Sequence, residues 1–107
     1  MNTRMFNEEL VATSDYQQES GNKWVLEYYL QIFEGESGES LYGLRVDKST
    51  PEGVLHESEE TFAITECREE ALVMAMAFSR GSVPPVTLLE MSDDWLSELE
   101  SNLLTTV

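Results

Sequence analysis

Cys67 and His56 are the residues of this chain best suited to nucleophilic catalysis, and each is the only one of its type. A cysteine attacks a substrate best when a neighbouring imidazole accepts its proton. Cys67 lies near the start of a predicted helix, which favours a thiolate, but acidic side chains surround it and oppose that effect, namely Glu66, Glu69 and Glu70. We therefore expect Cys67 to be a half-buried structural residue and His56 to be a solvated strand residue.

The residue pattern gives little support for a metal site or for catalysis by paired carboxylates. One cysteine and one histidine cannot form a structural zinc site, and no Asp-x-Asp-x-Asp-Gly loop for calcium is present. Glu34, Glu36 and Glu39 share a loop that can hold a hard cation only weakly, so we expect a solvated loop. No glycosidase pair can be singled out among 21 acidic residues. The sequence therefore predicts no catalytic residue, no cofactor and no metal.

Net charge is the unusual feature of the composition. The 21 acidic residues stand against six basic ones, which gives a formal charge of -15. Such a chain repels nucleic-acid phosphates and anionic lipids, so we expect no direct binding to nucleic acid or to a membrane. The charge is explained either by solubility alone, or by an acidic face that docks a basic partner or imitates a nucleic-acid backbone.

The cellular location follows from two absences in the sequence. A single cysteine allows no intrachain disulfide, which is typical of a reducing compartment. Residues 1–9 contain no apolar core of the signal-peptide kind, and the longest apolar run, residues 71–78, is less than half as long as a membrane span. We therefore expect a cytoplasmic protein.

The chain of 107 residues, 41% of them hydrophobic, predicts one domain over 1–107, with 1–8 and 101–107 frayed. Alternating apolar residues are typical of antiparallel strands and predict three or four of them, at 24–33, at 42–46, within 54–64 and, as a short strand, at 9–14. The first two of these should form a hairpin.

Helical signals begin after Thr65. Residues 68–80 are rich in Ala, Met, Leu and Glu, with Thr65 or a neighbour as cap and Gly81 as the stop. A second helix should begin at about Leu88, where Thr87–Glu90 matches a capping box and Val86 and Met91 match its hydrophobic staple. Strands followed by helices predict an α+β fold, with a small antiparallel sheet and two C-terminal helices packed on one face.

The predicted core combines the strand period of two with the helical period of 3.6. Its members are Trp24, Leu26, Tyr28, Leu30, Ile32, Tyr42, Leu44, Val46, Phe62, Ile64, Leu72, Met76, Leu88, Met91 and Trp95.

Residues 40–97 resemble a family of small domains of unknown function from Firmicutes. The resemblance rests on Tyr42-Gly43 in a strand, on Pro85-Val86-Thr87-Leu88 and on Asp94-Trp95-Leu96. The family pattern has His where this chain has Thr87 and Phe where it has Trp95. Because that family has no assigned activity, the resemblance implies a fold and a bacterial host but no function.

Two classes of function remain. The first is a non-enzymatic protein-interaction or regulatory module that binds a protein partner, basic or not, through the helices or a free strand edge. A homodimer is a further option. Its alternative form is an acidic inhibitor or nucleic-acid mimic, of the mobile-element type, acting on a nucleic-acid enzyme. The second class is a small enzyme that uses Cys67 or carboxylates, and we expect no enzyme. The candidate interaction face is the outer side of the second helix, with Glu90, Asp93, Asp94, Glu98 and Glu100.

Overall fold

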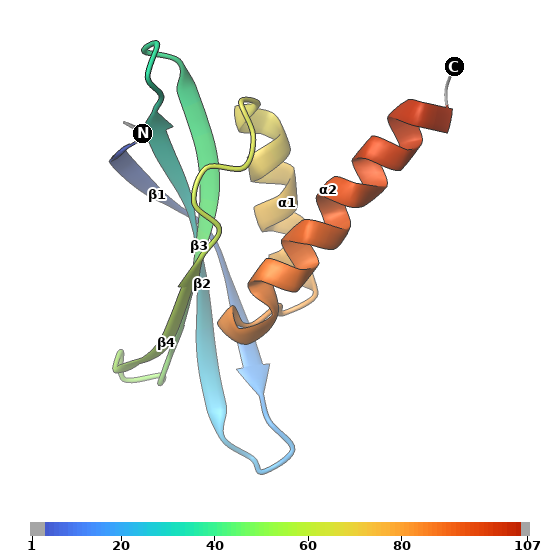
Figure 1. Cartoon of the computed structure of the whole chain (residues 1–107). Coiled ribbons are helices and arrows are strands. Elements are labelled where there is room, and N and C mark those ends of the chain that lie inside the picture. Colours follow the sequence, from blue (N-terminus) through green and yellow to red (C-terminus); the bar gives the residue numbers. More distant parts are fainter. Residues whose placement is uncertain (1–3, 106–107) are drawn as a thin grey trace.

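The sheet is a meander of four antiparallel strands in the computed structural model, which describes residues 4–105 and, within them, the side chains of residues 4–98. The strands are β1 (Arg4–Gln17), β2 (Lys23–Glu34), β3 (Ser40–Ser49) and β4 (Leu55–Glu60), and they lie side by side in that order. Short turns suffice to join antiparallel neighbours, so this topology needs no crossover. Figure 1 shows that the sheet is strongly twisted.

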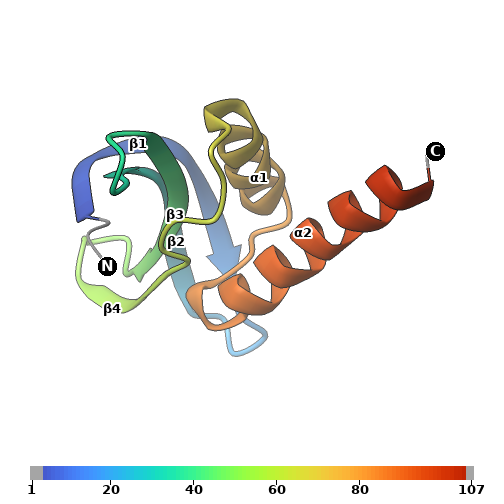
Figure 2. The ribbon, with the colours of Figure 1, turned by 45° about the horizontal axis from the view of Figure 1, so that its top comes forward.

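Three helical segments follow the sheet, namely α1 (Arg68–Arg80), the 3₁₀ helix η1 (Pro85–Thr87) and α2 (Leu88–Thr105). α1 contacts β1, β2 and β3, and both α-helices lie on the same side of the sheet (Figure 1). α2 begins beside η1 and β4, and Figure 2 shows its C-terminal part leading away from the rest of the chain. The predicted α+β fold, with two C-terminal helices on one face of an antiparallel sheet, is confirmed.

The core lies between the sheet and α1. Tyr28 pairs with Val46 and Leu30 with Leu44, as the predicted hairpin of β2 and β3 requires, and all four side chains are buried. The Tyr28 hydroxyl donates a hydrogen bond to the carbonyl of Val83, in the connector between α1 and η1, with 2.9 Å between the oxygens. Burial raises the pKa of Tyr28 well above its usual value. The hydroxyl therefore stays protonated and links the sheet to the connector.

Three predicted core residues are exposed. The side chain of Phe62 is 64% exposed, and those of Met76 and Met91 are more than one third exposed. β4 ends at Glu60, and Phe62 has a positive φ of 60°, so the chain leaves the strand before Phe62 and turns this side chain outward. The other predicted core residues are buried or partly buried.

The side of α1 that faces the sheet differs from the predicted one. The sequence pattern favours Leu72 and Met76, whereas the buried residues are Ala71, Met74, Ala75 and Phe78. Apolar residues occupy nearly all sides of this helix, so its periodicity does not select the inner side. The two alanines let the helix backbone approach the sheet closely, which gives the better packing.

Both ends of the regular structure extend further than the sequence indicates. β1 begins at Arg4 rather than near residue 9, and α2 reaches Thr105. The fraying expected of residues 1–8 and 101–107 stays a prediction. Residues 1–3 and 106–107 lie outside the described residues. Arg68, the first residue of α1, forms an ion pair with Glu9 of β1 with an N–O distance of 2.9 Å. This hydrogen bond from Arg68 lowers the pKa of Glu9.

The capping box predicted at Thr87 does not form. Thr87 is part of the 3₁₀ helix, and its hydroxyl donates backward to the carbonyl of Pro84, with 3.4 Å between the oxygens. The predicted staple is absent too, because Val86 and Met91 are both exposed. The prolines start a helical turn earlier than the pattern suggests, so Thr87 is already inside a turn when α2 begins.

Candidate functional site

The two residues suited to nucleophilic catalysis lie on different elements. Cys67 is the N-cap residue of α1 and is exposed, so the prediction that it is half-buried is wrong. The buried side of α1 starts one turn later, at Ala71, and therefore leaves Cys67 in solvent. Thr65, the expected cap, accepts a hydrogen bond from the backbone N–H of Cys67 instead, at 3.0 Å.

His56 is an exposed residue of β4, as expected. Its ring meets that of Trp24 edge to face, with 4.6 Å between ring centroids. No hydrogen bond joins His56 to Cys67 within residues 4–98. The expectation that the protein is not an enzyme stays a prediction.

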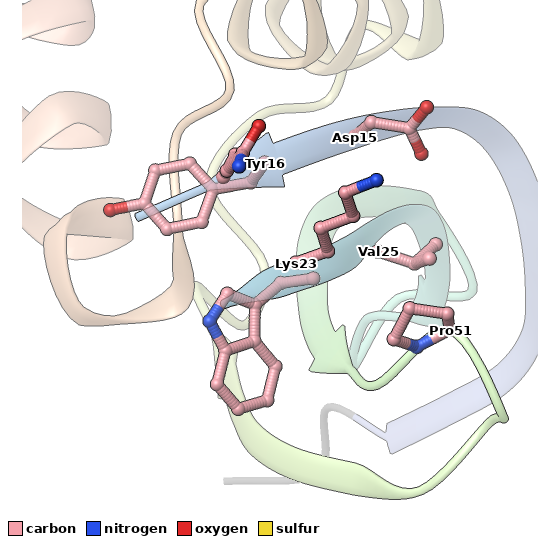
Figure 3. A pocket seen from close by; sticks show the side chains of 7 residues that line it. Asp15, Tyr16, Lys23, Val25 and Pro51 are labelled. Carbon is pink, nitrogen blue, oxygen red and sulfur yellow. The ribbon is translucent and has the colours of Figure 1, made fainter. Parts of the chain in front are cut away.

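A pocket of about 430 Å³ opens at one end of the sheet (Figure 3). Strands β1 and β2 and the turn after β3 line it through Asp15, Tyr16, Gln17, Lys23, Trp24, Val25 and Pro51. Its volume is in the range of small-molecule sites. Its lining includes neither Cys67 nor His56, so the pocket does not unite the nucleophile and base that catalysis would need.

Lys48 lies beside this pocket, among aromatic rings. Its ammonium nitrogen is 4.5 Å from the ring centroid of Trp24 and 5.8 Å from that of Tyr16. The same nitrogen forms an ion pair with Glu57 of β4 at 3.1 Å, and the residue is 8% exposed. Cation–π contacts and an ion pair together compensate for the burial of this charge. They join Lys48 of β3 to side chains of the other three strands at this end of the sheet.

A second polar cluster joins side chains of β1, β2, β3 and β4. Gln31 is 1% exposed, and its amide nitrogen donates to Glu8 at 2.9 Å and to Glu60 at 3.1 Å. Arg45 donates to the same Glu8 at 2.9 Å and to Asp47 at 3.1 Å. Side chains of all four strands are thus tied together.

Arg45 stays positively charged within this cluster. Its burial acts to lower the pKa, but the carboxylates of Asp47 and Glu8 outweigh burial, and the pKa of Arg45 is raised. The guanidinium also lies over the ring of Tyr29, 4.1 Å from its centroid. Burial, with the charges of Glu27 and Asp47, raises the pKa of Tyr29. The cluster is therefore a structural network in which the carboxylates already have hydrogen-bond partners.

The sequence pattern alone does not predict this network. A signal for it exists, because polar residues recur at alternate positions of β2 and β3, on the side away from the core. Alternation of that kind usually marks a solvated face, and only the tertiary structure shows that Gln31 is buried.

The acidic residues predicted to form a face of the second helix are exposed wherever the structure describes their side chains. Glu90, Asp93, Asp94 and Glu98 are all exposed on α2, and none forms an ion pair with a described residue. The side chain of Glu100 lies outside the described residues. The opposite side of the helix is anchored by Leu88, which is buried, and by Trp95, which meets Phe78 edge to face at 5.9 Å.

This acidic stretch has a definite size. Residues 90 and 98 are separated by roughly 12 Å along the axis, at about 1.5 Å per residue. A helix of this kind presents carboxylates in a row on a rigid support. The arrangement can attract a basic surface.

The glutamate loop between β2 and β3 shows no cation cage. Glu39 accepts a hydrogen bond from the backbone N–H of Ser37 at 3.0 Å, so this carboxylate closes its own turn. Among the residues that the structure describes, no group of three or more His, Cys, Asp or Glu side chains could hold a metal ion. No helix within residues 4–105 is long and apolar enough to cross a membrane.

Comparison with known proteins identifies a family. The model of a family of unknown function, DUF6514, matches residues 7–98, and the chain belongs to this family. Neither a curated protein nor a solved structure matches the chain. The Firmicutes origin stays a prediction.

Proposed function

We propose that this member of the DUF6514 family is a non-enzymatic protein-interaction module that docks a basic protein partner through α2. The proposal rests on one observation, namely that the same helix extends away from the sheet and carries acidic residues on its outer side. α2 is held at its start by η1 and β4, its far part leads away from the sheet (Figure 2), and its outer side is acidic.

The charge arrangement supports a role beyond solubility. Glu90, Asp94 and Glu98 are spaced four residues apart, so their side chains are neighbours on the helix surface and repel one another. Repulsion of this kind weakens a helix by a few tenths of a kcal/mol per pair. A basic partner would remove the repulsion on binding, and its approach would be accelerated by the negative field of the whole chain.

Charge reversal with a matched control tests this proposal. One variant carries Asp93→Lys, Asp94→Lys and Glu98→Lys, all on α2. The control carries three reversals at exposed acids elsewhere, Glu19→Lys, Glu52→Lys and Glu66→Lys. Each set changes the formal charge from -15 to -9, since every reversal adds two charges. Both proteins should fold, because all six side chains are exposed.

The assay is affinity capture from the host lysate, followed by binding measurements with the purified captured protein. We expect wild type and control to bind it, the α2 variant to lose it, and the affinity to fall steeply as salt shortens the Debye length from about 10 Å at 0.1 M to about 3 Å at 1 M. If the α2 variant binds as well as the control, this docking surface is refuted. Competition by duplex DNA would favour the alternative function, an acidic mimic that acts on a nucleic-acid enzyme.

A further inference from the structure

The pocket at the end of the sheet brings an acidic and a basic side chain together. Asp15, Gln17, Lys23 and Val25 share one side of the β1–β2 pair, because Asp15 pairs with Val25, Gln17 pairs with Lys23, and side chains alternate along a strand. Figure 3 shows Asp15, Lys23, Val25 and Pro51 around the pocket. One pocket therefore contains a carboxylate, an ammonium group and apolar surface.

Neither of these two charges is neutralised within the protein. Arg45, Lys48 and Arg68 each form an ion pair in this chain of 21 acidic residues, whereas Lys23 forms none with any described residue. Asp15 likewise has no ion-pair partner among residues 4–98. The pocket thus offers one free charge of each sign to a ligand.

Two closed turns hold the walls of the pocket. In the turn between β1 and β2, the N–H of Gln18 donates to the carbonyl of Asn22 at 3.0 Å. In the turn after β3, the N–H of Thr50 donates to the carbonyl of Val54 at 2.9 Å, and the Thr50 hydroxyl accepts from the Val54 N–H at 3.0 Å. Pro51 lies inside this second turn. A site that is formed in advance loses little entropy on binding, which suits a small ligand.

The charges of the pocket select the class of ligand. An anion would pair with Lys23, but Asp15 and the net charge of -15 would repel it. A cation would pair with Asp15 but would be repelled by Lys23. A zwitterion is neutral overall and can form a charge-assisted hydrogen bond with each group.

We propose that this pocket binds a free α-amino acid, with the ligand carboxylate on Lys23 and the ligand ammonium group on Asp15. The volume of about 430 Å³ leaves room for a large side chain. Val25 and Pro51 offer it apolar surface, so the ligand side chain is apolar. The pocket lining contains no residue of α2, so this site and the docking of a basic partner succeed or fail separately.

NMR titration of the full chain with phenylalanine tests the site, at about pH 6, where α-amino groups are protonated. We expect saturable shifts of the backbone amides of residues 15–17 and 23–25, with a dissociation constant at or below about 1 mM. Phenylalanine amide lacks the carboxylate and N-acetylphenylalanine lacks the ammonium group, so each should bind at least about tenfold more weakly. The absence of saturable shifts, or an analogue that binds as tightly as phenylalanine, overturns the proposal.

Substitutions in the chain locate the two contacts. Asp15→Asn and Lys23→Gln each remove one charge, and each should raise the dissociation constant for phenylalanine at least about tenfold. The control, Glu69→Gln with Arg80→Gln, removes one charge of each sign on α1, outside the pocket, and should bind as wild type does. All four side chains are exposed, so the variants should fold. If the two pocket variants bind phenylalanine as tightly as the control, the site is refuted.

The analogues and the variants together test the orientation of the ligand. Phenylalanine amide has no carboxylate to place on Lys23, so Lys23→Gln should not weaken its binding. N-acetylphenylalanine has no ammonium group to place on Asp15, so Asp15→Asn should not weaken its binding. Weaker binding in either of these two combinations contradicts the assignment of the ligand groups to Lys23 and Asp15.

Discussion

Replacement of Gly43 by alanine should destabilise the fold strongly, because the backbone of Phe62 lies against this residue. After β4, residues 61–65 continue along the same edge of β3 and bond to the residues before and after Gly43, ending in an antiparallel bridge between Tyr42 and Thr65. The N–H of Thr61 donates to the carbonyl of Leu44 at 2.9 Å, and the N–H of Ile64 donates to that of Tyr42 at 2.8 Å. A Cβ added at Gly43 would lie 2.6 Å from the carbonyl carbon of Phe62 and would overlap its oxygen.

The size of the effect follows from these contacts. The overlapping atoms belong to the backbone of Phe62, so no side chain can turn aside and residues 61–65 must move. Overpacking of this kind costs about 1–3 kcal/mol. Loss of one of the two hydrogen bonds adds about 1 kcal/mol. A total of about 2–4 kcal/mol should lower the melting temperature by roughly 10–30 °C, since each kcal/mol corresponds to about 4–8 °C in a domain of this size.

Thermal and urea unfolding followed by circular dichroism measure this change. Gly81→Ala is the matched control, because Gly81 has a φ of -88° and an added Cβ there would meet its nearest atoms at 3.8–3.9 Å, in ordinary contact. The control should melt within a few degrees of wild type. If Gly43→Ala melts like the control, the backbone of residues 61–65 does not lie against Gly43 as described and the reasoning is refuted.

Three further predictions concern single side chains. Tyr28→Phe removes the buried hydrogen bond to Val83 and should cost about 1 kcal/mol in urea unfolding, whereas no loss would mean that the bond is absent. Thr87→Ala should change the melting temperature little, because the Thr87 hydroxyl makes no capping hydrogen bond that the substitution could remove. A loss of about 1 kcal/mol in the free energy of unfolding, the usual value of a helix cap, would show instead that the capping box forms. The hydrogen bond from Arg68 lowers the pKa of Glu9, so the pair stabilises the fold above the unfolded-state pKa of Glu9 and stops doing so as pH falls through the lowered value. Melting curves of wild type and Arg68→Gln should therefore differ at neutral pH and converge in acid, and a difference that is independent of pH would contradict this assignment.

Local patterns determined the order and type of the elements. The alternation in β2 and β3 and the helix formers in α1 operate over a few residues, so the hairpin and the bounds of α1 follow from the sequence. Composition likewise identified the acidic outer side of α2, because charged residues on a regular helix stay in solvent whatever the helix packs against.

Tertiary contacts decided the remaining features, because these depend on residues far apart in the chain. Packing against the sheet selected the side of α1 that carries the alanines as the buried one. Because apolar residues occupy nearly all sides of this helix, its own pattern does not indicate which side is buried. Gln31 is buried because Glu8 and Glu60, from the two edge strands, converge on it. Phe62, apolar by type, is turned into solvent where the chain leaves β4 and its backbone lies against Gly43. Periodicity shows which residues share a side of an element. The surface that this side contacts forms only when the chain folds.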